Sequence, residues 1–390
     1  MRKKILFIAH SIFTYGGEQR VCIEIMNALC QNADIVVITG ERETEKNVYK
    51  VDERIKVICN PYVREFGICG TLKIVIRRLS AVFNIFKKRC FKNLLFWAYN
   101  RDEYFQEIIS HVKEEKPDIV VGVAGLNTQL LYEISKECKV KTIAWMHNSY
   151  EAYFETPGVY HWNQDYLFQE MLPQIDKCVV LNDYIAKRYK ESFHVDCKVI
   201  YNPRSFESEQ KTDFSKKQFI ASGRMVYAKG FDLLIESFEI FSKKNNDWNL
   251  VILGDGKYKS ILEKKIKKAG LEERVTLTGF TNEVKKYMVE SSIFLLTSRW
   301  EGFPMVITEA LEFGLPVIAY DITAMLPLVT NGVEGILVEA FDTKKYAEEM
   351  LNLAENREMQ QKMSANGIKK ASQISIQNIV KQWEELFEEL

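Results

Sequence analysis

Short apolar runs alternate along most of the chain with segments whose apolar residues recur at helical spacing. In the first half, the runs predict strands at residues 5–9, 35–39, 55–59, 119–123, 142–146, 178–181 and 198–201. In the second half, they predict strands at residues 219–222, 250–253, 275–277, 293–297, 316–319 and 335–338. Runs that are apolar throughout are typical of parallel sheets that helices cover on both faces. The pattern therefore predicts an α/β protein.

The strand pattern is interrupted once, by a polar segment that we interpret as a linker at residues 204–217. It separates an N-terminal domain, residues 1–203, from a C-terminal domain, residues 218–374. Residues 375–390 are expected to form a C-terminal helix that crosses back to the N-terminal domain. Each domain is predicted to be a doubly wound, Rossmann-like parallel sheet. Two such sheets would face a cleft and hold a ligand at the carboxyl ends of their strands.

Composition narrows the class of protein. The 390 residues are 47% hydrophobic and 27% charged, which excludes a disordered or low-complexity chain. The 53 basic and 53 acidic side chains cancel, so we expect no nucleic-acid partner. The eight cysteines form no CxxC pair, and we find neither a secretory signal nor an apolar run as long as a membrane span. These features predict a cytoplasmic protein with reduced thiols, bound at most to a membrane surface.

The segment at residues 298–321 contains the most informative candidate site. Pro304 is typical of a first helical turn, so Glu301 should lie in the loop before a helix and Glu309 inside it. Backbone amides at the start of that helix would favour an anion such as phosphate, and the two carboxylates could bind hydroxyls. The amides belong to Phe303, Met305 and Val306. The alternative is an acidic first turn that only complements the helix dipole.

Two loops that follow predicted strands offer further groups for a phosphate. Arg224 and Lys229 come after the strand at residues 219–222, and two cations there would suit a leaving diphosphate. They could instead be solvated surface charges, although Gly223 in the same loop permits close backbone approach. Gly16 and Gly17 follow the first strand and predict the start of a helix, with a second loop lined by amides.

Several common signatures are missing from the sequence. It contains neither GxGxxG nor GxxxxGK[ST], so a dinucleotide fingerprint and a P-loop are not predicted. No Asp-x-Asp pair occurs, and no histidine pair has metal-ligand spacing. We therefore expect no metal site and no cofactor.

Taken in order, these motifs resemble those of a family 4 glycosyltransferase of GT-B architecture, and the likeness to bacterial capsule and O-antigen enzymes covers the whole chain. Glu301 and Glu309 match the E-x7-E signature of that family. Arg224 and Lys229 match its basic pair, and the GGEQR run that begins with Gly16 and Gly17 resembles its GG-x-E-R element. Gly279 and Phe280 resemble the loop that meets the nucleotide base.

The resemblance implies a metal-independent transferase that moves a hexosyl or N-acetylhexosaminyl group from a nucleotide sugar and retains its anomeric configuration. The nucleotide is expected to be UDP, bound by the C-terminal domain, while the N-terminal domain binds a lipid-linked or saccharide acceptor. In this family pattern, Arg224 and Lys229 stabilise the diphosphate, Glu309 holds the ribose and Glu301 the donor sugar. His147 matches a histidine that faces the reacting centre, and its alternative is a satisfied core histidine. His10, at the end of the first strand, could reach the same cleft.

Residues 71–100 contain seven basic side chains and no acidic one. Wound as one helix, they place the apolar residues on one stripe and the cations on the other half. The stripe comprises Leu72, Val75, Ile76, Leu79, Val82, Phe83, Phe86, Leu94 and Trp97. This pattern predicts a helix that docks on an anionic membrane, such as the inner face of the plasma membrane. The alternative is a domain helix that buries its stripe in the core.

Two other functions remain open on the sequence alone. The same fold could serve a nucleotide-sugar epimerase or hydrolase, although such an enzyme has no need of a cationic apolar helix. It could also serve a non-catalytic nucleotide-sugar-binding protein, a reading that the presence of Glu301, Glu309, Arg224 and Lys229 disfavours.

Overall fold

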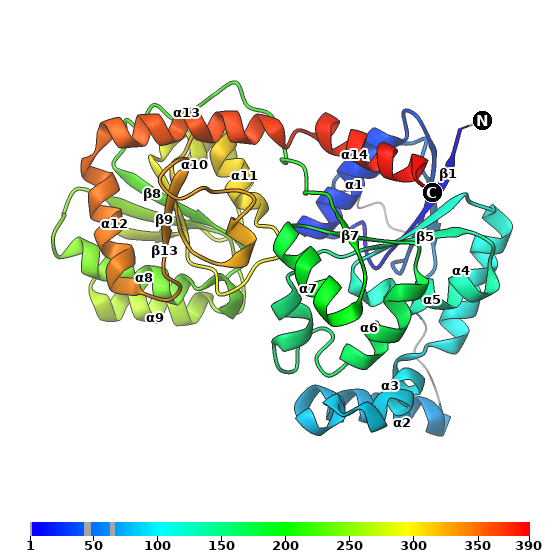
Figure 1. Ribbon diagram of the computed structural model, residues 1–390. Helices are drawn as coiled ribbons and strands as arrows, with labels where there is room; N and C mark the ends of the chain where they lie inside the picture. The colour runs from blue at the N-terminus through cyan, green and yellow to red at the C-terminus, as the bar shows by residue number, and fades with distance from the viewer. Residues whose placement is uncertain (1, 43–47, 63–66) are drawn as a thin grey trace. The chain divides into compact units, whose positions relative to one another are not determined.

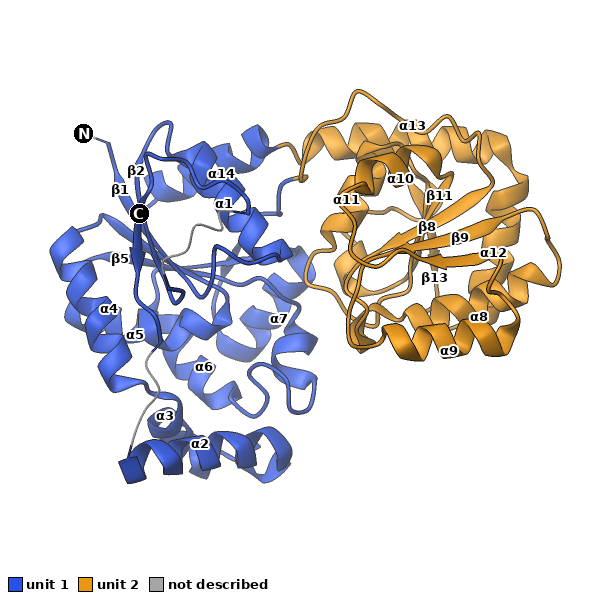
Figure 2. Ribbon diagram, turned by 180° about the vertical axis from the view of Figure 1, so that it is seen from behind, with its two compact units in different colours: residues 1–203, 376–390 blue, residues 204–375 orange. Residues whose placement is uncertain are grey.

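The computed structural model describes residues 2–42, 48–62 and 67–390, which form two compact units (Figure 2). Unit 1 comprises Met1–Pro203 and Ile376–Leu390, and unit 2 comprises Arg204–Ser375. Each unit is built on one parallel sheet. The α/β prediction is confirmed, and all thirteen strands predicted from the apolar runs are present among the described residues.

Unit 1 contains a seven-stranded sheet in the order β3-β2-β1-β4-β5-β6-β7. Its strands are β1 (Lys4–Ala9), β2 (Asp34–Thr39), β3 (Lys56–Cys59), β4 (Ile119–Val123), β5 (Lys141–Trp145), β6 (Lys177–Val180) and β7 (Cys197–Val199). Its longer helices are α1 (Gly17–Leu29), α2 (Gly67–Val82), α3 (Lys92–Tyr99), α4 (Asp102–Glu115), α5 (Thr128–Glu137), α6 (Asp165–Met171), α7 (Asp183–Phe193) and α14 (Ile376–Glu388). In Figure 1, α1 and α14 lie on one side of the sheet and α4 to α7 on the other. Both faces are thus covered, which is why the strands are apolar throughout.

Unit 2 contains a six-stranded sheet in the order β10-β9-β8-β11-β12-β13. Its strands are β8 (Gln218–Ser222), β9 (Asn249–Leu253), β10 (Val275–Leu277), β11 (Ile293–Leu296), β12 (Val317–Tyr320) and β13 (Gly335–Val338). Its helices are α8 (Phe231–Ser242), α9 (Lys259–Ala269), α10 (Val284–Glu290), α11 (Met305–Glu312), α12 (Thr343–Glu355) and α13 (Arg357–Gln373). Figures 1 and 2 show α8 and α9 along one side and α10, α11 and α13 along the other.

Both sheets reverse their strand order beside the first strand of the unit. In unit 1 the reversal lies between β1 and β4, and in unit 2 between β8 and β11. Loops that leave neighbouring strands toward opposite faces at such a point open a crevice at their carboxyl ends. The loops that follow these strands are therefore the expected place for a ligand.

The last helix, α14, belongs to unit 1. The buried Trp383 ring lies 4.8 Å from the Trp145 ring of β5, centroid to centroid. Beyond the helix, the carboxylate of Glu389 bonds the ammonium groups of Lys177 and Lys198 at 3.2 and 3.0 Å. Apolar packing and ion pairs thus attach the end of the chain to the first sheet.

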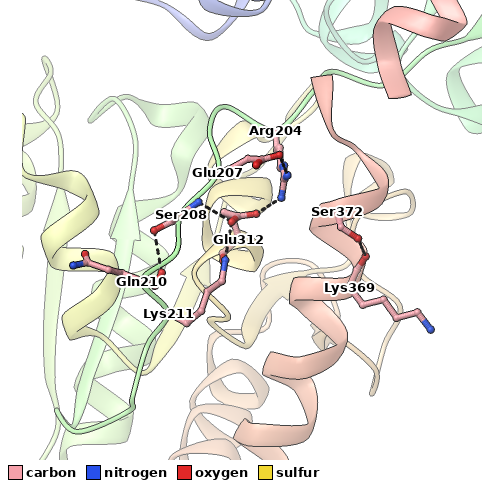
Figure 3. Close-up of polar contacts among 8 residues, drawn as sticks. All are labelled: Arg204, Glu207, Ser208, Gln210, Lys211, Glu312, Lys369 and Ser372. Atoms are coloured by element: carbon pink, nitrogen blue, oxygen red, sulfur yellow. Dashed lines mark hydrogen bonds and ion pairs between the residues drawn. The ribbon is translucent and has the colours of Figure 1, made fainter. Parts of the chain in front are cut away.

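The segment predicted as a linker, residues 204–217, belongs to unit 2, so that boundary is corrected. The carboxylate of Glu312, at the end of α11, is buried and accepts hydrogen bonds from Arg204, from the Ser208 amide at 2.9 Å and from Lys211 at 2.7 Å (Figure 3). The Thr212 amide donates to the Phe313 carbonyl at 2.9 Å. The polar groups of this segment donate hydrogen bonds to a buried carboxylate. The composition of the segment alone did not reveal that role.

The single helix predicted over residues 71–100 is also wrong. Helix α2 ends at Val82, two short 3-10 turns follow (Asn84–Lys87 and Arg89–Phe91), and α3 then packs back against α2. Lys73 and Arg77, expected on the solvated half, bond backbone carbonyls of Asn100 and Ala98 at 2.8 and 2.5 Å. The hairpin therefore turns part of its basic face inward.

Candidate functional site

The site in unit 2 is formed by the loops that follow β8 and β11, the two strands at the reversal of the sheet. The loop after β8 contains Gly223, Arg224 and Lys229, and the loop after β11 contains Glu301. Helix α11 begins directly after the second loop, with Pro304 as its N-cap residue. The structure thus brings the predicted basic pair and the predicted Glu301 to the same edge of one sheet.

An ion pair connects the two loops. The Lys229 ammonium lies 2.6 Å from Oε1 of Glu301, and the Ser298 hydroxyl donates to that same oxygen at 2.6 Å. The side chains of Lys229 and Glu301 are 21% and 11% exposed, so the pair is partly shielded from water. The stem of Lys229 passes beside Gly223, where a Cβ would be in ordinary van der Waals contact with its Cε at 3.4 Å. The φ of 155° at Gly223 is a backbone conformation that favours glycine.

Further contacts fix the two loops to each other. A Cβ at Gly230 would lie 1.9 Å from the carbonyl oxygen of Thr297, so only glycine permits this approach. The Arg299 amide donates to the Ala228 carbonyl at 2.7 Å. The Arg299 guanidinium bonds both carboxylate oxygens of Asp232 at 2.9 and 2.7 Å. Burial acts to raise the pKa of Asp232, but the hydrogen bonds from Arg299 outweigh it and lower that pKa.

Helix α11 supplies the rest of the unit 2 site. Its first turn contains Met305 and Val306, whose amides precede the regular helical bonds, and its dipole places partial positive charge at that end. Glu309 lies in the middle of the helix and is buried, as is Phe303 just before it. The side chain of Arg224, by contrast, is exposed to solvent. Arg224, Lys229 and Glu301 therefore lie in loops at the edge of the sheet where α11 begins, and Glu309 follows within that helix.

Gly279 and Phe280 follow β10 at the carboxyl edge of the same sheet. The Gly279 carbonyl accepts a hydrogen bond from the Gly254 amide at 3.1 Å, which ties the loop after β10 to the loop after β9. Phe280 is 63% exposed, an unusual position for a phenylalanine. The predicted base-contacting loop is thus at a strand end, with an aromatic ring accessible to a ligand.

In unit 1, the glycine pair predicted to open a helix does so: α1 begins at Gly17 with Gly16 as its N-cap. The Gly16 amide donates to the Tyr49 hydroxyl at 3.1 Å. Earlier in this loop, the amides of Ile12 and Phe13 both donate to a single carboxylate oxygen of Glu41, at 2.6 and 2.8 Å. Several amides of the loop predicted to bind an anion therefore already donate hydrogen bonds to side chains of the protein.

His147 lies just after β5, with its ring 4.1 Å from that of Trp145. Its Nε2 is buried and has no hydrogen-bond partner among the described residues. Burial lowers the pKa of His147 to about 3, so the imidazole is neutral near pH 7. Its backbone amide donates to the Tyr153 hydroxyl oxygen at 3.3 Å, and that oxygen also accepts from the Gly125 amide at 3.3 Å. Tyr153 thereby links the loops that follow β4 and β5.

Sequence reasoning missed four of these residues: Ser298, Arg299, Asp232 and Tyr153. Three of the six strands of unit 2 lie between Asp232 and Arg299 along the chain, so no local pattern pairs them. Tyr153 lies in a π-helical turn, Glu151–Glu155, which apolar periodicity does not signal. Ser298 lies in the same loop as Glu301, three residues before it, so this partner was close to the predicted site in the sequence.

Across residues 2–42, 48–62 and 67–390, no three His, Cys, Asp or Glu side chains come together as a ligand group.

Comparison with known proteins gives the same fold and chemistry. Residues 204–370 match the family model described as glycosyl transferases group 1. An uncharacterised glycosyltransferase of Haemophilus influenzae is 26% identical, over 98% of this chain and 99% of that protein. The amylovoran biosynthesis glycosyltransferase AmsD of Erwinia amylovora is 24% identical, over 98% and 99%.

Two further similarities concern ligands. A Campylobacter jejuni α-1,4-N-acetyl-D-galactosaminyltransferase, named for a saccharide acceptor on PP-undecaprenol, is 23% identical over 99% of both chains. The crystal structure of HepE from Anabaena in complex with UDP and glucose covers 100% of both chains with a TM-score of 0.76 and 19% identity. The chain is therefore a glycosyltransferase of the two-unit GT-B architecture, related to enzymes of bacterial polysaccharide synthesis, and its residues 204–370 form a group 1 glycosyltransferase domain.

Proposed function

We propose that the chain transfers a sugar from UDP to a lipid-linked saccharide with retention of anomeric configuration and without a metal ion. The observation that carries the proposal is the Lys229–Glu301 pair at the carboxyl edge of the unit 2 sheet, beside the start of α11. In this pair, a cation suited to a diphosphate and a carboxylate suited to sugar hydroxyls lie 2.6 Å apart, which supports these roles. The UDP complex of HepE and the acceptor in the name of the Campylobacter relative support the choice of donor and acceptor.

Each residue has a distinct role in this reaction. The bond between the anomeric carbon of the sugar and the β-phosphate oxygen breaks, and negative charge grows on that oxygen as it leaves. An acceptor hydroxyl oxygen bonds the anomeric carbon on the same face of the sugar, and the hydroxyl proton passes to the departing phosphate oxygen. Lys229, Arg224 and the amide end of α11 stabilise this charge, because preorganised positive groups act most strongly where charge develops. Glu301 binds hydroxyls of the donor sugar, and Glu309 binds those of the ribose. Gly279 and Phe280 contact the base.

The diphosphate must compete with Glu301 for Lys229. In the structure the ammonium is neutralised by the carboxylate, and Ser298 donates to the same oxygen. When the donor binds, the diphosphate gives Lys229 a second anionic partner. The carboxylate, still held by Ser298, can then accept bonds from sugar hydroxyls. The ion pair thus keeps both groups in position before the donor arrives.

A panel of UDP-sugars tests this function, with UDP release measured with and without an undecaprenyl-diphosphate-linked saccharide, in excess EDTA. We expect acceptor-dependent release, and NMR of the product should show the anomeric configuration of the donor. Lys229→Ala should lower kcat by about 10²- to 10³-fold with a smaller change in donor affinity. The matched control is Lys243→Ala, because Lys243 follows the far end of α8 and is exposed. An inverted product, or strict dependence on Mn²⁺ or Mg²⁺, would contradict the proposal.

We also propose that unit 1 docks on an anionic membrane through the α2–α3 hairpin. Within the described parts of the chain, no helix has both the length and the apolarity needed to cross a bilayer. Helix α2 nevertheless presents much of its apolar stripe to solvent, because Lys73 and Arg77 face inward toward α3. The exposed apolar residues of the hairpin are Ile68, Leu72, Val75, Leu79, Val82, Phe83, Ile85, Leu94 and Trp97.

The same hairpin keeps basic groups at its surface. Arg78, Lys87, Lys88 and Arg89 are exposed, and each cation near an anionic leaflet contributes about 1 kcal/mol. An exposed apolar stripe flanked by cations is typical of a helix that lies in the membrane interface. This arrangement supports peripheral attachment, which on a cytoplasmic enzyme would be to the inner face of the plasma membrane.

Sedimentation with vesicles tests the attachment. Wild-type protein should sediment with phosphatidylglycerol vesicles and much less with phosphatidylcholine vesicles. Replacing Leu72, Val75 and Leu79 together by Ser should abolish binding to both, and replacing Lys87, Lys88 and Arg89 by Glu should abolish the preference for anionic lipid. Ile261→Ser is the control, because Ile261 is an exposed apolar residue of α9 in unit 2. Unchanged sedimentation of both triple variants would refute membrane docking.

A further inference from the structure

Strands β1, β2 and β3 end together at one edge of the unit 1 sheet. Their register pairs Ala9 with Thr39 and Thr39 with Cys59. The residues that follow these three strand ends therefore leave the sheet side by side. They include His10, Gly40 and Tyr62, none of which the proposed donor site uses.

Four side chains gather at this edge. The rings of Tyr62 and Tyr104 meet edge to face, with centroids 5.7 Å apart and planes at 73°. The Arg101 guanidinium lies 4.5 Å from the centroid of the Tyr62 ring. A Cβ at Gly40 would stand 3.7 Å from the Tyr104 hydroxyl and 3.6 Å from Nδ1 of His10. Because Gly40 has no side chain, the hydroxyl and the imidazole both line the space above it.

The polar groups of this cluster are available to a ligand. His10 is exposed, Tyr62 is 36% exposed, and Arg101 and Tyr104 are partly exposed. Among the described residues, no carboxylate is paired with Arg101, whereas four other arginines of unit 1 have such a partner: Arg2, Arg20, Arg54 and Arg188. An arginine that stacks on a tyrosine without an acidic partner holds several donors in a fixed plane.

We propose that His10, Tyr62, Arg101 and Tyr104, which we call the edge cluster, bind a saccharide ring of the acceptor. Tyrosine faces pack against the apolar C–H face of a pyranose, while arginine, histidine and tyrosine hydroxyl groups bond its hydroxyls. The first turn of α4 adds Asp102 and Glu103, and Lys73 pairs with Asp102, so these two carboxylates balance the charges of Arg101 and Lys73. A neutral sugar therefore suits the cluster better than a free phosphate. This inference rests on the proposed transferase function and names where its acceptor is recognised.

The position of the cluster relative to the hairpin supports an acceptor ligand. Lys73 of α2 bonds the Asn100 carbonyl at 2.8 Å and the Asp102 carboxylate at 3.0 Å, the residues on either side of Arg101. The base of the α2–α3 hairpin is thereby fixed to the edge cluster. A saccharide whose lipid is held at the exposed face of the hairpin would be presented directly to these side chains.

Saturation-transfer NMR with a panel of methyl glycosides tests the cluster. The panel comprises the methyl α-glycosides of glucose, galactose, mannose, N-acetylglucosamine and N-acetylgalactosamine. At least one should give transfer to its ring protons in the wild-type chain. Tyr62→Leu and Arg101→Met should each weaken that binding about 10- to 100-fold, enough to remove the signal. Tyr62→Phe should retain it, because the ring remains. Arg2→Met is the control, since Arg2 is an exposed arginine at the opposite edge of the same sheet.

Binding of UDP, measured by calorimetry on the same variants, separates this inference from the proposed function. If Tyr62→Leu and Arg101→Met bind UDP as the wild type does and also keep the full glycoside signal, the edge cluster does not bind the saccharide. The transferase proposal would still stand in that case. Absence of signal from every glycoside in the wild-type chain would overturn it as well. Failure of the wild-type chain to bind UDP or release it from any donor would instead overturn the proposed function. Circular dichroism on each variant shows that the loss does not come from unfolding.

Discussion

At the scale of single residues, the unit 2 site is organised around one carboxylate oxygen. Oε1 of Glu301 receives both the Lys229 ammonium and the Ser298 hydroxyl. Ser298 is almost fully buried, so its hydroxyl has little alternative to this bond. The serine therefore acts as a positioning residue, because it keeps Glu301 in place when the donor draws Lys229 toward the diphosphate.

Ser298→Ala should consequently lower kcat more than it changes the KM for the donor. A hydrogen bond to a charged group contributes about 1.5–3 kcal/mol, or about 10- to 100-fold in rate if it orients the carboxylate in the transition state. Steady-state kinetics with the best UDP-sugar of the panel measures both constants. Ser242→Ala is the control, because that hydroxyl bonds only a backbone carbonyl at the end of α8. A kcat equal to that of wild type would contradict the positioning role.

The neutral state of His147 predicts how stability depends on pH. Its pKa is about 3 in the folded protein and about 6.5 when unfolded, so the unfolded chain binds the extra proton between these values. The free energy of unfolding should therefore fall as the pH is lowered from 6.5 toward 3. His147→Gln removes the titration, and urea unfolding at pH 7.5 and pH 5 should show a smaller loss in the variant. Burial also lowers the pKa of His161, to about 4, so part of the loss of stability at low pH should remain in both proteins. Equal losses would show that His147 is not held neutral.

At the scale of elements, helix α11 is supported from both ends. Its start faces the site, and its end is attached to the segment at residues 204–211 through Glu312. Burial acts to raise the pKa of Glu312, yet the bonds from Lys211, Ser208 and Arg204 lower it. A segment that resembles a linker in composition therefore fixes the helix that supports the donor site.

Glu312→Ala should destabilise unit 2 by roughly 3–5 kcal/mol, because it leaves buried donors without their carboxylate. Urea unfolding at pH 7, followed by circular dichroism, measures the change. The matched control is Glu207→Ala, since Glu207 contacts the same Arg204 but its side chain is 69% exposed. We expect that control to change stability by no more than about 0.5 kcal/mol. Similar effects of the two substitutions would refute the role of the buried carboxylate.

The elements also show what the sequence could predict. Apolar runs located the strands because burial on both faces demands uninterrupted hydrophobicity, and glycine and proline located the start of α1 and the loop before α11. The break after Val82 has no such signal, and neither do the bonds from Lys73 and Arg77 to carbonyls of a later segment. The contact between Asp232 and Arg299 depends likewise on which strands are neighbours. The pattern of apolar and polar residues therefore could not predict polar contacts between residues far apart in the sequence.

At the scale of the whole molecule, α14 connects the end of the chain to the core beneath His147. The Trp383 ring packs on Trp145, and the Trp145 ring packs on His147. Trp383→Ala should therefore destabilise unit 1 by about 3–5 kcal/mol while UDP binding by unit 2 persists. Urea unfolding and UDP calorimetry measure the two properties separately. Phe341→Ala, an exposed residue of unit 2, is the control. Loss of UDP binding in parallel with stability would contradict this division.

The division of the chain also bears on the order in which the protein is made. Unit 2 is one continuous stretch, Arg204–Ser375, whereas unit 1 is assembled from Met1–Pro203 and Ile376–Leu390. During synthesis, the first sheet leaves the ribosome early but lacks the helix that covers Trp145 until α14 emerges. All the strands of unit 2 are synthesised before α14, so unit 2 can fold while unit 1 is still incomplete. A nonsense mutation that removes α14 would therefore disrupt unit 1 and leave unit 2 intact.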